Sequence, residues 1–307
     1  MIVDKLLNAE VWDRLVRGKA LDSLGLGSKD GRLDLNGLTL PEPHVKRTFD
    51  FNSIPIAEME SVHSVKGAKW KGFDFTGSKL KHIRFFESEL SDCVFDRCQL
   101  EDLRVWTTKF NDCGFRRAKL KGSALGAVQN GKRNIYSGID FSEADLRDTA
   151  YQAAAFERCV FRNTKLEHID FESSTFADCV FEGELRDVLF NRRGFKGESF
   201  PPNEMLNVDF SQAKLYGVGF RGLTLEQVKL PDDSDHILIR NVTATLNRLI
   251  GTLNQQDDPT AKKLVAFLNI DKEWRPAGQV QTVINIEDLA ETVGDEGVDR
   301  LRGLLDQ

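Results

Sequence analysis

Residues 73 to 120 read FDFTGSKLKHIRFFESELSDCVFDRCQLEDLRVWTTKFNDCGFRRAKL, with a large apolar residue at every fifth position from Phe75 to Leu120. With two slips, the spacing continues to Leu230, and its thirty positions hold sixteen of the 21 phenylalanines. A period of five fits neither the 3.6-residue period of a helix nor the alternation of a simple strand. Self-similarity at a fixed period indicates a repeat architecture.

The repeating unit has a second feature besides its apolar centre. FTGSKL, FDRCQL, FSEADL and FSQAKL each place a small residue two positions before the next centre. In this the chain resembles the pentapeptide-repeat proteins, over about half of its length. The resemblance implies a mainly β fold, a right-handed four-sided β-helix with one pentapeptide on each side and twenty residues in each coil. Residues twenty apart do match in kind, as in Phe75, Phe95 and Phe115, so we expect them to stack in columns.

The small inward position holds all five cysteines, which are Cys93, Cys98, Cys113, Cys159 and Cys179. Cysteine acts there as a small hydrophobic residue. The pairs Cys93 with Cys113 and Cys159 with Cys179 are twenty apart, and a stacked pair could meet disulfide distances. The odd number of cysteines and the lack of a leader favour free thiols in a reducing compartment. No metal site is expected, because no His or carboxylate recurs at ligand spacing.

The period slips at two places. Leu125 and Phe141 are sixteen residues apart, and the polar, Gly-rich segment 126–138 between them is expected to form an external loop or bulge. Phe181 and Leu185 are one residue too close. Soon afterwards Arg193 and Glu198 fall at the inward small position, so either the coil is distorted there or the two charges pair inside it.

The rest of the chain divides around this repeat. Residues 1–32 predict an N-terminal helical segment, and residues 33–230 predict the β-helix, regular from about residue 71. Residues 231–307 lose the period and predict helices at 242–254, 260–270, 286–293 and 296–305, with an extended segment before the third. Because exposed coil ends are unpaired strand edges, we expect these helices to cap the coil or to form a dimer. A separate recognition module is the alternative.

Charge and hydropathy argue against nucleic acid and membrane as binding partners. The net charge of −6 lies wholly in residues 231–307, where eight basic residues face fourteen acidic ones. Direct binding to nucleic acid is therefore not expected, since phosphate contacts need clustered basic residues. No apolar run approaches the ~18 residues of a membrane span, and the N-terminus lacks the apolar region of a signal peptide. These features predict a cytoplasmic protein that does not enter a membrane.

None of the sequence motifs indicates a catalytic site. GAVQNGK at 126–132 has the glycine and lysine spacing of a phosphate-binding loop, but Arg133 stands where that loop needs Ser or Thr. The five histidines share no spacing with an acid or a nucleophile, and His82 and His168 fall at coil corners. A column-packed interior also leaves no substrate cavity. We expect no catalytic residue, cofactor or metal, and function on the outer faces, the loop or the ends.

Two surface features are candidate interaction sites. Arg84 with Phe86 and Arg104 with Trp106 are twenty apart, so they should stack into one outward patch of arginine and aromatic side chains. Either a partner covers this patch, or the N-terminal helix or an end helix lies on it. The second feature is the loop, with Asn130, Lys132, Arg133 and Tyr136. Arg116, Arg117 and Arg133 could form a basic edge beside it, although their pattern favours a solvated charged face.

These features favour a non-enzymatic scaffold that binds a protein partner through a rigid rod. The alternative comes from the resemblance. Some pentapeptide-repeat proteins of the quinolone-resistance group mimic duplex DNA, bind DNA gyrase or topoisomerase IV, and modulate inhibition by fluoroquinolones. They dimerise through a C-terminal helix, so the resemblance implies a homodimer here. The repeat region departs from that group, because residues 71–230 hold 24 basic and 24 acidic residues.

Overall fold

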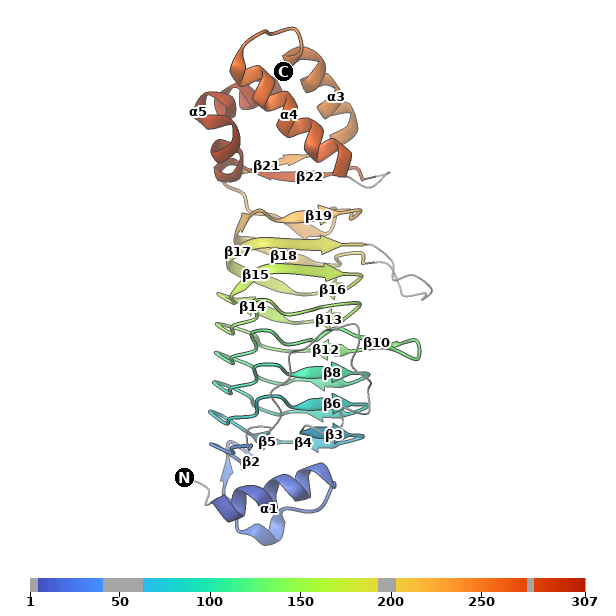
Figure 1. Ribbon diagram of the computed structural model, residues 1–307, viewed down its shortest axis with the longest axis vertical. Coiled ribbons are helices and arrows are strands. Elements are labelled where there is room, and N and C mark those ends of the chain that lie inside the picture. Colours follow the sequence, from blue (N-terminus) through green and yellow to red (C-terminus); the bar gives the residue numbers. More distant parts are fainter. Residues whose placement is uncertain (1–4, 41–62, 193–202, 275–278, 307) are drawn as a thin grey trace.

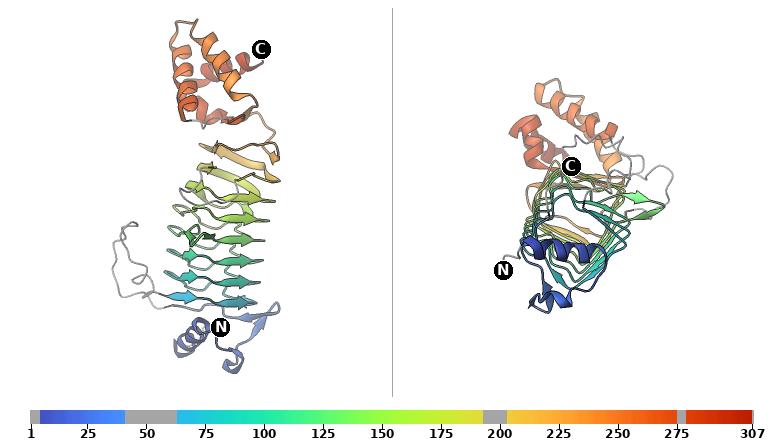
Figure 2. Two further views of the ribbon diagram at one scale, coloured as in Figure 1. Left: turned by 90° about the vertical axis from the view of Figure 1, so that its right-hand side faces the viewer. Right: turned by 60° about the horizontal axis from the view of Figure 1, so that its bottom comes forward.

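The computed structural model describes residues 5–40, 63–192, 203–274 and 279–306 of the chain. They form a rod of stacked coils, with helix α1 (Lys5–Val16) across one end and a helical unit at the other (Figure 1). This confirms the expected right-handed, four-sided pentapeptide-repeat β-helix and the helical segments that flank it. Viewed obliquely from its N-terminal end, the rod shows its sides as separate stacks of strands (Figure 2).

Short parallel strands form the sides of the rod, and most pair with a strand twenty residues away. One side is a six-stranded sheet of β4 (Lys69–Lys71), β7 (Glu89–Ser91), β9 (Lys109–Asn111), β12 (Ile135–Ser137), β13 (Ala155–Glu157) and β16 (Thr175–Ala177). A second side begins with β3 (Ser64–Lys66), β6 (Arg84–Phe86) and β8 (Arg104–Trp106). Later coils contain β14 (Val160–Arg162), β15 (Leu166–Glu172), β17 (Val180–Asn191), β18 (Val208–Tyr216), β19 (Gly219–Arg221) and β20 (Val228–Lys229).

The core of the rod consists of vertical columns of apolar side chains. Phe95 lies between Phe75 and Phe115, with ring centroids at 5.1 and 4.9 Å and nearly parallel planes. The same column continues upward through the rings of Phe141, Phe161, Phe181 and Phe210. All five cysteines are free, buried thiols at the inward small position. The period of five therefore fixes which side chains fill the interior.

Most corners of the coil lie two residues after a centre and take a left-handed backbone conformation. His82 has φ of 59° and His168 has φ of 55°, so both lie at corners as predicted. Asp and Asn tolerate this conformation better than most residues, and glycine adopts it freely. At Gly138 φ is 66° and an added Cβ would lie 2.3 Å from Asp112 Oδ1, so a larger residue there would force the Asp112 side chain to move.

The first slip of the period is an insertion, and one expectation about it is wrong. Phe110 pairs with Tyr136, 26 residues later, and the Tyr136 ring stacks between Phe110 and Phe156 at 5.3 and 5.1 Å. Tyr136 is therefore a buried centre rather than a loop residue. Only an earlier part of the segment 126–138 leaves the rod, as a hairpin of β10 (Val128–Gln129) and β11 (Lys132–Arg133). The missed clue is that Tyr136 precedes Phe141 by five residues.

The second slip shortens one coil and is followed by a long one. Phe171 pairs with Phe190, which is 19 residues later, and Ala177 pairs with Leu206, which is 29 residues later. The columns still continue, because Phe181 stacks on Phe210 with ring centroids 4.7 Å apart. The predicted inward Arg193 and Glu198, and the predicted centres Phe195 and Phe200, lie outside the described residues.

The N-terminal end of the rod is closed by α1 and a partial coil. Leu35 and Leu40 are buried, and their N–H groups donate to the carbonyls of Asp74 and Lys79 in the coil above. Regular stacking already includes Val65 and Trp70, earlier than the predicted start near residue 71. Trp70 Nε1 donates to the Leu15 carbonyl at 3.3 Å, which joins α1 to the core. The elements here are the 3-10 helix Asp22–Leu24, β1 (Ser28–Lys29), β2 (Arg32–Asp34) and β5 (Phe73–Asp74).

The C-terminal unit has its own hydrophobic core. It contains the antiparallel pair β21 (His236–Ile239) and β22 (Thr282–Asn285), with helices α3 (Val242–Leu253), α4 (Pro259–Trp274) and α5 (Ile286–Leu305). These match the expected helices and extended segment, with one difference. The two helices predicted at 286–293 and 296–305 run together as α5, interrupted at Gly294 with φ of 75°.

Side chains of the C-terminal unit accept hydrogen bonds from backbone N–H groups near the end of the rod. The N–H of Gly217 donates to Asp288 Oδ2 at 2.6 Å, and the N–H of Leu215 donates to His236 Nε2 at 3.2 Å. The N–H groups of Gly222 and Leu225 donate to Gln279 and Gln281. These acceptors replace the carbonyl groups that a further strand would bring, so they cover part of the open edge.

The Phe95 column gives a test of the core. Replacing Phe95 with Ala should lower the free energy of unfolding by about 3 to 5 kcal/mol, because the ring is buried and the rigid coils above and below cannot close the cavity. Denaturant unfolding followed by circular dichroism measures the loss. The control Lys79→Ala, on an exposed side chain, should change it by less than about 0.5 kcal/mol. Similar losses for both variants would contradict the column as the main source of stability.

Candidate interaction surface

The predicted patch of arginine and aromatic side chains lies on one side of the rod. Strands β6 and β8 pair in register, so Arg84 lies below Arg104 and Phe86 below Trp106. The rings of Phe86 and Trp106 stack with centroids 4.6 Å apart and planes 4° from parallel. The twenty-residue spacing therefore places these four residues together as expected.

The exposure expected for this patch is wrong for two of its residues. Arg84 is 1% exposed and Phe86 is 5% exposed, whereas Arg104 and Trp106 are partly exposed. A residue beside a centre points away from the core, yet neighbouring chain can still cover it, and spacing alone does not reveal that. Helix α1 lies across the end of the rod rather than along this side (Figure 1). Only Arg104 and Trp106 of the four present surface to a partner.

A carboxylate at the corner fixes the two arginines. Asp102 Oδ2 accepts from Arg84 at 2.6 Å, Asp102 Oδ1 accepts from Arg104 at 2.6 Å, and His82 Nδ1 lies 2.9 Å from Oδ2. Burial alone would raise the pKa of Asp102, but the attraction of Arg84 and the bonds from His82 and Arg84 outweigh it and lower that pKa. Burial lowers the pKa of Arg84, and Asp102 opposes this change. Sequence reasoning missed Asp102, whose only signal was its corner position beside two arginines.

A groove of about 520 Å3 runs along the same side of the rod. We call this side of the rod the groove face, and the residues that line the groove define it. At one end Arg84, Arg104 and Trp106 line the groove, and at the other end Asp170 and Glu172 line it. Between them lie Ala124, Gly126, Ala150 and Gln152, which carry no charge. The bridges Arg104 to Ala124 and Ala124 to Ala150 place these residues in successive coils.

The hairpin β10–β11 projects from the rod (Figure 1), and Gly126 and Ala127, which line the groove, lie directly before it in the chain. Its turn at Asn130 and Gly131 has φ of 52° and 69°, which suits the Asn-Gly pair of a tight hairpin. Asn130 and Lys132 are exposed and Arg133 is partly exposed, so these three predicted loop residues do lie on a projecting element. The antiparallel pairing of Val128 with Arg133 also means that GAVQNGK forms a hairpin and not a phosphate-binding loop.

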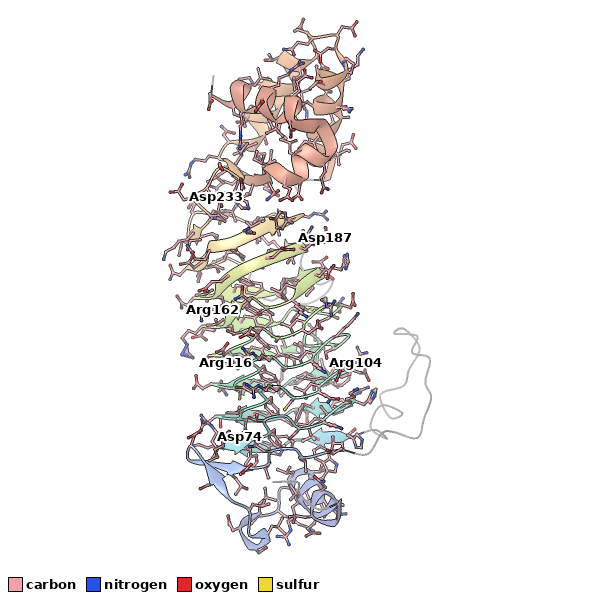
Figure 3. The ribbon with its side chains drawn as sticks, turned by 90° about the vertical axis from the view of Figure 1, so that its left-hand side faces the viewer. Asp74, Arg104, Arg116, Arg162, Asp187 and Asp233 are labelled. Atoms are coloured by element: carbon pink, nitrogen blue, oxygen red, sulfur yellow. The ribbon has the colours of Figure 1, made fainter. Side chains whose placement is uncertain are left out.

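Charges on the other sides of the rod are mixed. Arg117 pairs with Glu143 at 2.8 Å, Arg116 with Asp140, and Arg162 with Glu182, each one coil apart. Figure 3 shows Arg116 and Arg162 along one edge of the view and Arg104 along the other. The possible basic edge of Arg116 and Arg117 is therefore neutralised by carboxylates. In the described coils, no side carries an unbroken acidic strip, because basic residues such as Lys119 and Lys165 alternate with acidic ones.

Two other kinds of feature, a metal cluster and a membrane-spanning helix, are absent from the described residues. No group of three or more His, Cys, Asp or Glu among them is placed to hold a metal ion. None of the helices in the described ranges combines the length and apolar character that crossing a bilayer requires. His236, which the sequence did not single out, has a nearly buried side chain between Asp233 and the Leu215 N–H. Because its Nε2 accepts a hydrogen bond from the Leu215 N–H, this histidine belongs to the junction between the rod and the C-terminal unit.

Comparisons with known proteins bear on the repeat. A family model described as pentapeptide repeats matches residues 139–178 in eight copies. The curated pentapeptide repeat protein MfpA of Mycobacterium tuberculosis (strain ATCC 25618 / H37Rv) is 33% identical over 94 residues. That match covers 31% of this chain and 44% of MfpA, so the chain spans less than half the length of this relative.

Solved structures of low identity are also similar. Full-length QnrB1, a plasmid-mediated fluoroquinolone resistance protein, is 18% identical with a TM-score of 0.18, and the match covers 55% of this chain and 94% of QnrB1. HetL, a pentapeptide repeat protein involved in heterocyst differentiation regulation from Nostoc sp. strain PCC 7120, is 12% identical with a TM-score of 0.16, covering 56% of this chain and 90% of HetL. Likeness at this level carries no argument about function.

The Asp102 cluster predicts a pH-dependent loss of stability. Asp102→Asn should lower the free energy of unfolding at pH 7 by about 3 to 5 kcal/mol, because it leaves the buried Arg84 charge without its partner. The pKa of Asp102 is lowered by folding, so its contribution is present above the unfolded pKa of about 3.9 and is lost as pH falls through the folded pKa. The difference between wild type and variant, measured by denaturant unfolding, should therefore shrink below about pH 4.

A matched control is Asp148→Asn, at the same corner position on a later coil. Asp148 is half exposed and lies 3.3 Å from Lys121, so its loss should stay below about 1 kcal/mol. Equal effects of the two substitutions at pH 7 would show that the Asp102 cluster adds no more than an exposed ion pair.

Proposed function

We propose, from the premise that this chain is a pentapeptide-repeat protein, that it is a non-catalytic scaffold and that a partner protein docks on the groove face. The observation that carries the proposal is the groove itself, which combines Trp106, an uncharged floor and charged ends on a rigid surface. Aromatic and arginine side chains are enriched in protein interfaces. The projecting residues Asn130, Lys132 and Arg133 lie close enough to widen the contact.

The packed core supports a scaffold role in a second way. Stacked rings such as Phe161 on Phe181, 4.6 Å apart, leave the interior filled, so the rod offers its surface rather than a cavity. A rod of this kind pays little conformational entropy when a partner binds, because its backbone is already fixed. Cytoplasmic location stays a prediction from the sequence. Pairing of two copies through the C-terminal helices is a further proposal, to which the exposed Ile270 of α4 gives an apolar contact point.

A substitution inside the groove tests the docking face. Ala150→Arg should abolish capture of the partner from a lysate of the native host, because Ala150 is exposed and a long charged side chain would fill the uncharged floor. Tagged protein, affinity capture and mass spectrometry provide the measurement. The matched control is Ala155→Arg, the same change at the equivalent repeat position on the adjacent side. Retention of every captured protein by Ala150→Arg would refute docking at this groove.

A second candidate function is modulation of DNA gyrase or topoisomerase IV by DNA mimicry. The observation in its favour is the 33% identity to MfpA over 94 residues, together with the resemblance to the quinolone-resistance group. The mixed charge of the coils weighs against it, since duplex DNA carries dense and uniform negative charge.

The supercoiling activity of gyrase separates the two candidates. With a large molar excess of this protein, we expect no change in the rate of supercoiling, because no side of the described coils presents a row of carboxylates. Plasmid supercoiling on agarose gels measures the rate, with heat-unfolded protein as the control. Inhibition by the folded protein alone would favour the DNA mimic over the scaffold.

A further inference from the structure

We propose that the groove binds an extended segment of the partner protein that carries an acidic side chain and, four residues on, a basic side chain, with uncharged residues between them. The inference rests on the proposed function and adds the chemistry of the partner. It follows from the order of groups along the groove, which runs from Arg104, with the buried Arg84 beside it, through alanine and glycine to two carboxylates.

The basic end of the groove is fixed before any partner binds. Asp102 holds Arg104 through Nε at 2.9 Å and through its terminal nitrogen at 2.6 Å, and it also holds Arg84. One carboxylate between two guanidinium groups leaves a net positive charge. Because these side chains are already ordered, a partner carboxylate would bind without the entropy cost of ordering a free arginine.

The middle of the groove is uncharged and lined by small residues. Ala124 and Ala150 pair across adjacent coils, so two methyl groups form the floor. Gly126 lies against the next coil so closely that an added Cβ would be 2.1 Å from the Gln152 nitrogen. The ring of Trp106 stands beside this floor, held in place by its stack on Phe86. A segment lying here would pack its backbone and an uncharged side chain against apolar surface.

The acidic end comes from strand β15. Asp170 is exposed and Glu172 is partly exposed, and both line the groove. The rings of Tyr151 and Phe171 are in contact, with centroids 4.6 Å apart and planes tilted by 38°, which places this coil directly above the coil of Ala150. A basic side chain of the partner would meet two carboxylates here, whereas a phosphate backbone would be repelled.

The spacing of the charged ends fits an extended peptide. Arg104 and Asp170 are three coils apart, which is about 14 Å at the usual separation of strands. In an extended chain, alternate side chains share one face, and residues i and i+4 are about 13 Å apart. One acidic and one basic side chain at that separation reach both ends together. A small zwitterion could not reach both, so the geometry favours a polypeptide.

The test uses fluorescein-labelled peptides with the full-length protein. The first contains Glu-Thr-Ala-Thr-Lys, the second has the reverse order to allow either direction, and the third contains Glu-Thr-Ala-Thr-Glu. Fluorescence polarisation at low salt should show that one of the first two binds at least about tenfold more tightly than the third, the effect of one well-placed charge pair of about 1.4 kcal/mol. Equal binding of all three would overturn the inference.

A charge reversal makes the test specific to the groove. The double variant Asp170→Lys with Glu172→Lys should reverse the preference, so that the peptide with two acidic residues binds more tightly. The control carries the same change of charge outside the groove face, with Glu167→Lys on the neighbouring side and Asp187→Lys at a corner, and should keep the wild-type preference. Circular dichroism checks that both variants fold. The same behaviour in both double variants would mean that net charge, and not the groove, selects the peptide.

The peptide and capture experiments can fail separately. If Ala150→Arg loses the captured partner while wild-type protein has no peptide preference, the docking face stands and the inference about its ligand falls. If the preference and its reversal are observed while Ala150→Arg captures every protein that the wild type captures, the groove is a peptide site and the proposed docking face falls.

Discussion

The structure depends on the stacking of like side chains in vertical columns. A coil can close only if its four apolar centres point inward, and coils can stack only if each centre meets another of similar shape one coil away. The near-parallel rings of Phe75, Phe95 and Phe115 satisfy both conditions. Corner residues in the left-handed conformation let the chain turn between sides. The same period of five therefore sets both the side chains of the core and the turns of the backbone.

The columns explain why the rod tolerates changes in coil length. The coil that joins Phe110 to Tyr136 has six extra residues, and they leave as the hairpin β10–β11 while Tyr136 keeps its place in the column. Asn134 fills the small inward position there and donates to the carbonyls of Val105 and Leu125. An insertion is thus accepted wherever the buried polar groups that it brings find partners. The rod offers projecting elements without losing its core.

The outward residues set what each side of the rod can bind. Most sides alternate acidic and basic residues, and pairs such as Arg117 with Glu143 neutralise one another. The groove face differs, because its charges are separated to the two ends with Ala124 and Ala150 between them. The separation follows from the identities of residues twenty apart, yet the hollow between them depends on how far each side chain and the hairpin extend. The charges of the groove face therefore follow from the repeat spacing, whereas its shape follows from the sizes of the side chains and from the hairpin.

The sequence by itself determined the β-helix, the positions of its columns, the corner histidines His82 and His168 and the flanking helices, because a fixed period dictates which side chains can share a core. It also brought Arg84, Phe86, Arg104 and Trp106 together. Only the tertiary structure decided that Arg84 and Phe86 are buried, that Tyr136 is a core residue and that Asp102 joins two arginines. Period fixes the direction in which a side chain points, whereas burial depends on what chain lies over it, and that contact comes from residues distant in sequence.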